Sequence, residues 1–344
     1  MYALVPQQHE GRQLMPGCSR RAGLGWICLT CGCGLVAVAS GFFLPHWLTG
    51  CLPPPLWYYG RTIACFIIGG PSSAEESAVS SNDRVVAVAN LKGGVGKSTT
   101  VLNVAGFAAK AGRRVLMIDT DPQASLTQVT LREDARPTVT LADVLRSRAA
   151  SLEGAIIPSV LPGVDLVPSS LSLESVLNQS LSLEGREYLL AEALDPHAAA
   201  YDLVLIDCRP AIDLSVTNAL TAARWMLVPV ECSFMALDGY EHVMALAERL
   251  RKRINPDLTL LGILPTRYRS GTGHSQEALK AIDGYVAQAQ PALRFQPIRL
   301  AVAAADAPAY GQSLAQFAPT SAVGREYETV TGQILAWLDQ EVWR

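Results

Sequence analysis

From Asp83 to the C-terminus, short apolar runs alternate with segments whose apolar positions recur at helical spacing. Short β-branched and apolar runs predict buried strands, whereas longer segments with a helical period predict amphipathic helices. The predicted strands cover 84–90, 113–119, 164–169, 202–207, 225–231, 258–266 and 294–300. The predicted helices cover 98–112, 140–147, 173–194, 213–223, 235–253, 275–288 and 320–342. This alternation predicts an α/β fold, a mostly parallel doubly wound sheet with helices on both faces.

A glycine-rich loop, "KGGVGKST" at 92–99, lies between the first predicted strand and its helix. The glycines let the backbone curl so that successive N–H groups face one side, where the helix N-terminus also favours phosphate. Lys97 is placed to reach the β- and γ-phosphates, and the Ser98 hydroxyl suits Mg²⁺. The loop therefore predicts a P-loop fold with ATP and Mg²⁺ as ligands. The phosphate-binding residues are Lys92, Gly93, Gly94, Val95, Gly96, Lys97, Ser98 and Thr99.

Three aspartates lie at the ends of two further predicted strands. Asp119 and Asp121 end the second strand, and Asp207 ends the run 202–207. Because ligands of parallel sheets bind at the carboxyl ends of the strands, we expect all three beside the loop. A lone aspartate there is often a cap or turn residue, but three in this order indicate a metal site. The predicted Mg²⁺ ligands, direct or through water, are Ser98, Asp119 and Asp207.

Six motifs in this order resemble the ParA/MinD family of deviant Walker ATPases, most closely its ParA-type, Soj-like partition members. The resemblance covers about 84–342. The motifs are "KGGVGKST" at 92–99, "DTDPQAS" at 119–125, "YDLVLIDCRP" at 201–210, "VPVECSFMALDG" at 228–239, "ILPTRY" at 263–268 and "ADAPAYGQSL" at 305–314.

The resemblance implies a slow ATPase that forms a homodimer when it binds ATP and is stimulated by a ParB-like or cargo-adaptor protein. In the family, the lysine matching Lys92 reaches across the dimer to the nucleotide of the partner subunit. The implied catalytic residues are Lys92, Lys97 and Asp121, the last supporting the attacking water, while Asp207 holds a metal-bound water. The implied function is partition or positioning of plasmid DNA, chromosomal DNA or another large cargo, in the cytoplasm at the nucleoid.

Two departures from the family pattern bear on this function. The family's Asp-x-Pro-Pro step is Asp207-Cys208-Arg209-Pro210 here, so Arg209 either assists hydrolysis or forms a salt bridge. ParA-type proteins commonly carry a DNA-binding arginine where this chain has Ala303. Arg299 is the candidate substitute.

Charge restricts DNA binding to a local patch, since the net charge is −3 and the pI about 6.0. Cations near 249–253 also suit a solvated helix C-terminus, which is the alternative explanation for them. Nonspecific DNA binding is expected to use phosphate contacts and to weaken with salt. The candidate DNA contacts are Arg249, Arg251, Lys252, Arg253, Arg267, Arg269 and Arg299.

Six of the eight cysteines precede residue 70, so the later domain has no disulfide framework. Cys208 and Cys232 are expected to be buried structural thiols rather than iron–sulfur ligands. Cys28, Cys31 and Cys33 lack a second ligand pair at finger-like spacing, which argues against zinc.

Residues 1–82 form a separate predicted unit, an apolar, cysteine-rich extension with a polar linker at 71–83, ahead of the ATPase domain at 83–344. The stretch 25–48 has the length of a transmembrane segment, but Arg20 and Arg21 before it would keep the N-terminus cytoplasmic and export the ATPase domain. A hairpin through 62–70 has too short a second arm. A poorly structured extension, a membrane hairpin or surface anchor within 22–70, and other roles all remain open.

Three function classes compete. The first is a partition ATPase that binds DNA, and the second is a MinD-like or membrane-tethered positioning ATPase that uses a lipid surface. The C-terminal stretch "GQILAWLDQEVWR" is amphipathic but too acidic for anionic lipid, so tethering would depend on 22–70. The third, a biosynthetic ATP-dependent enzyme, would need an added substrate domain for which the chain has no room.

Overall fold

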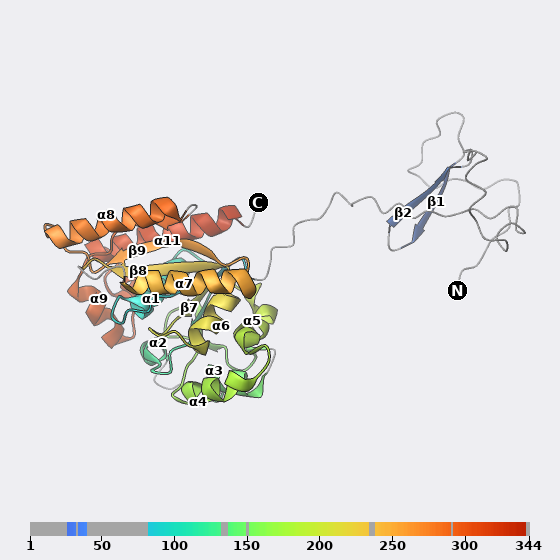
Figure 1. Ribbon diagram of the computed structural model, residues 1–344, viewed down its shortest axis with the longest axis horizontal. Helices are drawn as coiled ribbons and strands as arrows, with labels where there is room; N and C mark the ends of the chain where they lie inside the picture. The colour runs from blue at the N-terminus through green and yellow to red at the C-terminus, as the bar shows by residue number, and fades with distance from the viewer. Residues whose placement is uncertain are drawn as a thin grey trace, which may run out of the picture. The chain divides into compact units, whose positions relative to one another are not determined.

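The computed structural model describes residues 26–31, 34–39, 82–131, 137–148, 151–233, 238–289 and 292–341. The chain divides into two units, Met1–Ser77 and Ala78–Arg344. In the first, β1 (Trp26–Cys31) pairs with β2 (Gly34–Ala39) in antiparallel register (Figure 1). Half of the transmembrane candidate 25–48, the short arm 62–70, nearly all of the linker and Cys33 lie outside the described residues. The described helices include none with the length and apolar character needed to cross a membrane.

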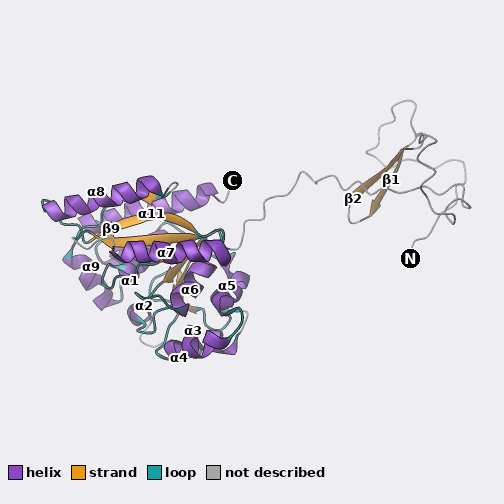
Figure 2. Cartoon of the chain, viewed as in Figure 1, coloured by secondary structure: helices purple, strands orange, loops and turns teal. Residues whose placement is uncertain are grey.

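The second unit is built on an eight-stranded sheet (Figure 2). The strand order is β10-β9-β8-β3-β7-β4-β6-β5, and every neighbouring pair is parallel except β5 with β6. The strands are β3 (Val85–Val88), β4 (Val115–Asp119), β5 (Ile157–Pro158), β6 (Val164–Val167), β7 (Leu203–Asp207), β8 (Trp225–Glu231), β9 (Thr259–Thr266) and β10 (Leu293–Arg294). This architecture confirms the predicted fold class.

Helices cover both faces of the sheet, so each face has its own apolar core (Figure 1). One face carries α3 (Leu141–Ser147), α4 (Ser172–Gln179), α5 (Leu189–Ala198), α6 (Leu214–Ala222), α7 (Asp238–Arg253) and α8 (Gly273–Gln288). The other carries α1 (Lys97–Lys110), α2 (Ser125–Thr130), α9 (Val302–Asp306), α10 (Leu314–Phe317) and α11 (Ala322–Glu341). Strands buried on both faces explain why they read as continuous apolar runs.

The amphipathic C-terminal stretch lies in α11 as far as Glu341, where the described residues end. The apolar side chains Tyr327, Val330, Ile334 and Leu338 of this helix are buried against the sheet. The apolar face of this helix therefore stabilises the domain core and is not available to a membrane.

The structure corrects two predicted elements. The helix predicted over 173–194 is two helices, α4 and α5, because the chain becomes extended at Leu183 (φ −83°, ψ 140°) and turns back through Gly185, which is left-handed at φ +69°. In place of the strand predicted over 294–300, the structure has the two-residue strand β10, Leu293–Arg294. The chain still follows β9, since Phe295 N donates to Ile263 O (3.0 Å) and Ile298 N to Pro265 O (2.8 Å), but Pro297 has no N–H for the ladder.

Candidate functional site: a phosphate-binding loop

The loop between β3 and α1 has the backbone form of a phosphate cradle. Gly94 (φ +74°) and Gly96 (φ +91°) are left-handed, which a side chain would oppose. A Cβ added at Gly93 or Gly96 would meet no atom within 4 Å, so open space lies in front of the loop. The first N–H groups of α1 have no partner inside the helix. The loop therefore offers N–H donors to an anion.

Side chains hold the carbonyl groups of this loop. Thr266 Oγ1, at the end of β9, donates to Val95 O at 2.8 Å, and the neighbouring Arg267 Nη1 donates to Gly94 O at 3.1 Å. Because the carbonyls of Gly94 and Val95 point toward β9, the N–H groups of the loop are left to face a ligand. A third side chain, Thr100 on α1, donates through Oγ1 to the carbonyl of Gly96, the third glycine of the loop, at 2.7 Å.

The two lysines of the loop occupy different surroundings. Lys97 is buried, and its Nζ donates to Lys92 O at 3.1 Å. Burial lowers the pKa of Lys97, and the carboxylate of Asp207 opposes that shift. The Lys92 ammonium instead lies 3.3 Å from Glu231 Oε2 and donates to Ser233 Oγ at 3.2 Å, just beyond β8. Lys97 thus serves its own loop, while Lys92 is held beside β8.

Asp119 and Asp121 form a connected turn after β4. The Asp119 side chain is fully buried, and Oδ1 accepts from Asp121 N (3.0 Å) while Oδ2 accepts from the N–H (2.9 Å) and hydroxyl (2.7 Å) of Thr127. Burial raises the pKa of Asp119 to about 6, and the Thr127 contacts oppose the rise. Both Asp119 oxygens are therefore occupied by protein donors, so Asp119 positions Asp121 and the start of α2.

Asp207 is different, because its buried carboxylate oxygens have no hydrogen-bond partner within the described part of the chain. Burial raises the pKa of Asp207, as does the charge of Asp119, while the nearby Ser98 hydroxyl and the positive charge of Lys97 lower it. An orphaned carboxylate beside a serine hydroxyl at the start of α1 fits a Mg²⁺ ion or its bound water, since Mg²⁺ takes oxygen ligands. The residues present therefore fit the predicted metal, with Ser98 and Asp207 as its holders.

Arg209, the departure from the family pattern, is paired with acids. Its Nη1 lies 3.0 Å from Asp213 Oδ2 and 3.8 Å from Glu174 Oε1. Asp213 also caps α6 through a 3.2 Å contact from Val216 N. The salt-bridge alternative for Arg209 is thus the one observed.

Cys208 and Cys232 are buried free thiols, as predicted. No group of three or more metal-ligating side chains lies among the residues that the structure describes.

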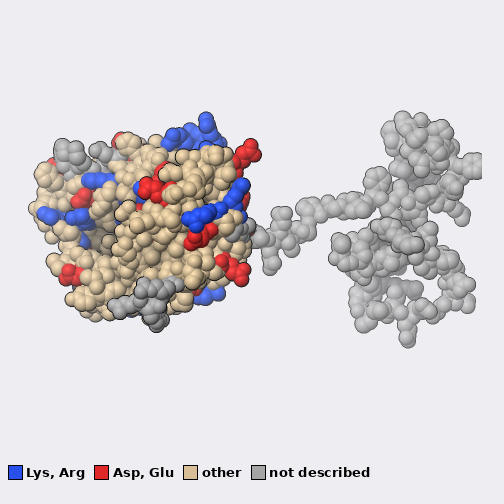
Figure 3. All heavy atoms as spheres, turned by 90° about the horizontal axis from the view of Figure 1, so that it is seen from below, with Lys and Arg blue, Asp and Glu red and all other residues tan. Residues whose placement is uncertain are grey.

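The structure places the basic residues in two groups at opposite ends of the sheet. β8 and β9 are parallel and α7 connects them, so the C-terminal end of α7 lies at the amino ends of the strands. Arg267, Arg269 and Arg299 instead lie at the carboxyl ends, and Arg299 Nε contacts Glu326 Oε1 at 2.6 Å. On the face drawn in Figure 3, basic side chains lie in several separate places, some of them next to acidic side chains. The first group consists of Arg249, Arg251, Lys252 and Arg253.

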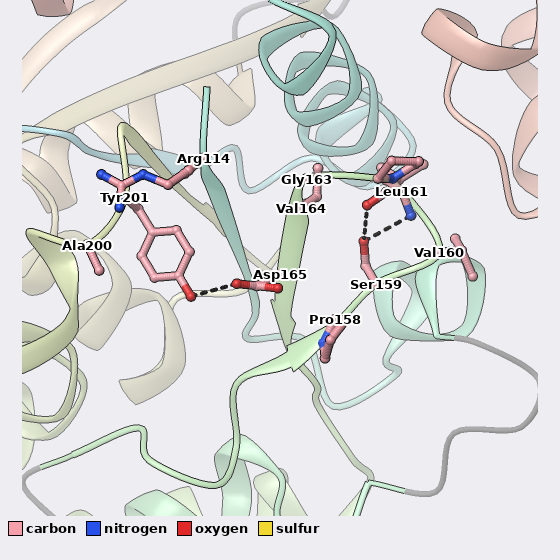
Figure 4. Close-up of a pocket in the computed structure, with 11 residues that line it drawn as sticks. Arg114, Pro158, Ser159, Val160, Leu161, Gly163, Val164, Asp165, Ala200 and Tyr201 are labelled. Carbon is pink, nitrogen blue, oxygen red and sulfur yellow. Dashed lines mark hydrogen bonds between the residues drawn. The ribbon is translucent and has the colours of Figure 1, made fainter. Parts of the chain in front are cut away.

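A pocket of about 610 Å³ lies at the amino ends of β4, β6 and β7, away from the phosphate loop (Figure 4). Arg114 and Tyr201 line it, and the Tyr201 hydroxyl donates to Asp165 Oδ2 at 2.8 Å. Ligands of parallel sheets bind at the opposite, carboxyl ends. This pocket is therefore not the nucleotide site.

Sequence reasoning missed Glu231 and Thr266 as parts of the site. Both stand inside quoted motifs, at the ends of predicted strands 225–231 and 258–266. Their position at the carboxyl edge of the sheet was the signal that could have identified them.

Comparison with known proteins decides the family. A family model described as an AAA domain matches residues 83–260. The chromosome-partitioning ATPase Soj of Thermus thermophilus is 34% identical over 253 residues, which are 74% of this chain and 96% of Soj. The chain belongs to the ParA/MinD family of P-loop ATPases.

The chain is also similar to an uncharacterized protein and to an enzyme of known structure. An uncharacterized protein of Mycobacterium tuberculosis is 37% identical over 199 residues, 58% of this chain, and the match spans 63% of that protein's length. A crystal structure of cobyrinic acid a,c-diamide synthase from Mycobacterium smegmatis with bound ATP analog and magnesium has a TM-score of 0.64. It is 31% identical and covers 75% of this chain and 96% of that chain.

Proposed function

We propose that this ParA/MinD-type ATPase is a switch that dimerises on binding ATP and positions DNA or another large cargo. The observation that carries the proposal is the separation of the two loop lysines. Lys97 is buried in its own cradle, whereas Lys92 is held outside it by Glu231 and Ser233. A loop that needed both cations for its own nucleotide would direct both inward.

The residues of one subunit divide the work on the nucleotide. The N–H groups of 93–99 bind the phosphates, and Lys97 adds a charge at the β- and γ-phosphates. Mg²⁺, when bound, neutralises charge on the phosphates. Ser98 and Asp207 would hold the ion, and Asp119, which accepts hydrogen bonds from Asp121 N and Thr127 N, would fix Asp121 where it supports the attacking water.

Lys92 belongs to the second subunit's site. Two ammonium groups near an empty loop repel each other, whereas a bound triphosphate supplies negative charge for both. ATP therefore favours a dimer in which Lys92 of each subunit contacts the nucleotide of the other, and hydrolysis weakens that preference. A ParB-like or cargo-adaptor protein that stimulates hydrolysis would release the dimer.

The end of α7 is the proposed nonspecific DNA surface. Arg249, Arg251, Lys252 and Arg253 are all exposed there, although Glu248 pairs with Arg251 (2.8 Å) and Lys252 (3.0 Å). Arg299 is tied to Glu326 and Arg267 to Glu231, so these two are weaker candidates. Dimerisation would double the α7 charge and so strengthen phosphate binding.

Cosedimentation of the full chain with nonspecific duplex DNA, with ATP or ADP, tests the DNA part. We expect ATP-dependent binding that falls steeply with salt and weakens in Arg251→Ala, with Arg146→Ala on α3 as the control. A parallel arm with anionic vesicles tests membrane tethering through 22–70. Binding to vesicles without binding to DNA would replace the DNA proposal with the tethered alternative.

A biosynthetic enzyme is the second candidate, favoured by the similarity to the Mycobacterium smegmatis synthase over 96% of that chain. ATP turnover measured with cobyrinic acid and an amide donor separates the two. We expect ATP turnover that is not stimulated by cobyrinic acid and yields no diamide product. Diamide product would overturn the switch.

A further inference from the structure

One carboxylate at the end of β8 is shared by two cations. Glu231 Oε2 lies 3.3 Å from Lys92 Nζ, and Glu231 Oε1 lies 3.4 Å from Arg267 Nε. The Glu231 side chain is 25% exposed, so water solvates its negative charge only in part. Any movement of the Lys92 ammonium away from Glu231 therefore changes the charge that Arg267 faces.

Arg267 also contacts the phosphate loop itself. While Nε faces Glu231, Nη1 donates to Gly94 O at 3.1 Å, so one guanidinium spans the loop and the acid. Its backbone has φ +53°, a left-handed conformation that costs a non-glycine residue energy. Because a glycine would adopt this backbone without strain, the arginine side chain itself is expected to have a role at the site.

We propose that Arg267 is a positioning residue that keeps Glu231 paired when Lys92 leaves for the partner subunit's nucleotide. The inference rests on the proposed dimer switch and adds the residue that sets its balance. In a chain without Arg267, Glu231 would lose its ion pair with Lys92 and would have no arginine beside it to balance its charge. With Arg267, the acid stays paired, so releasing Lys92 costs less.

Arginine suits this role for two reasons. Its charge does not depend on pH in the physiological range, and its forked geometry allows one donor to face the acid while another faces a carbonyl. A lysine would retain the charge but offer one nitrogen for both contacts. The role also explains a cation at 267 that lies apart from the α7 group.

The test is ATP-dependent dimerisation of the full chain, measured by sedimentation velocity with ATP–Mg²⁺ or ADP–Mg²⁺. We expect Arg267→Ala to weaken the ATP dimer about tenfold, a loss between that of an exposed ion pair and that of a fully buried one. Arg146→Ala, which removes an exposed arginine paired with Asp143, should leave dimerisation unchanged. Arg267→Lys should fall between wild type and alanine.

A double variant separates positioning from a general loss of loop structure. In Glu231→Ala the acid that Arg267 neutralises is gone, so adding Arg267→Ala should change dimerisation by less than about twofold. An equal tenfold loss in both backgrounds would overturn the proposal, as would an unchanged Arg267→Ala dimer. Wild-type chain that stays monomeric with ATP would overturn the dimer switch and this inference together, whereas a wild-type dimer with an insensitive Arg267 overturns the inference alone.

Discussion

Asp119 and Asp207 occupy paired positions at the ends of neighbouring strands β4 and β7, and both side chains are almost completely buried. The two acids differ in their partners, since Asp119 is fully hydrogen-bonded and Asp207 has none in the described part of the chain. Two buried acids side by side destabilise a protein that binds nothing between them. The arrangement is consistent with an ion that compensates for this cost.

Asp207→Asn should therefore stabilise the nucleotide-free chain and impair metal use. The isosteric amide removes a buried charge, and we expect the Tm of the α/β domain to rise by about 2–4 °C. Differential scanning calorimetry with EDTA measures the first effect. Titration of a fluorescent ATP analogue with and without Mg²⁺ measures the second, and an unchanged Mg²⁺ dependence would contradict the metal assignment.

Thr266→Val tests the support of the phosphate loop. The substitution keeps the shape but removes the hydroxyl that donates to Val95 O, leaving a buried carbonyl unsatisfied at a cost of about 1–3 kcal/mol. We expect weaker binding of ATP analogue in calorimetric titration. Thr329→Val on the exposed side of α11 is the matched control and should bind like wild type.

Packing of α10 against α1 can be tested at a glycine. A Cβ added at Gly106 would lie 2.2 Å from Ser313 Oγ, so Gly106→Ala should destabilise the domain by about 1–3 kcal/mol. On α8, an added Cβ at Gly284 meets nothing within 4 Å, so Gly284→Ala should stabilise it by about 0.5–1 kcal/mol. Urea unfolding of both variants checks the opposite signs.

Alkylation of the Cys232 thiol should depend on pH in a defined way. Burial raises its pKa to about 11, and Glu231 adds to the rise. Because the thiolate is the nucleophile, iodoacetamide should react at pH 8 about 10²-fold more slowly than in the unfolded chain, and the rate should increase with pH until about 11. Mass spectrometry of the Cys232 peptide gives the rate. Equal rates in folded and unfolded chains would show that the thiol is not buried.

Sequence predicted the features that depend on local pattern. β8 was predicted residue by residue as 225–231, and the phosphate loop, Asp119 and Asp207 were placed at the correct strand ends. Contacts between distant segments were not predictable in this way. The hydrogen bond from Thr266 to Val95 joins residues 171 positions apart, and nothing local in either segment indicates it.

Basic residues show the same limit. The sequence places Arg251 at the end of a predicted helix and Arg267 after a predicted strand, both as candidate DNA contacts, yet only Arg267 contacts the loop. The difference arises from the direction of α7, which carries Arg251 to the far end of the sheet. Short helices α2, α9 and α10 were also missed, because four to six residues contain too little of a helical period to detect.

Sedimentation velocity of the full chain with Lys92→Ala, compared with wild type, tests the central claim most directly. With ATP–Mg²⁺, wild type should sediment as a dimer and with ADP–Mg²⁺ as a monomer, while Lys92→Ala should remain monomeric in both. Lys280→Ala, an exposed lysine on α8, should behave as wild type. A Lys92→Ala chain that dimerises with ATP as wild type does would contradict the assignment of Lys92 to the partner's nucleotide.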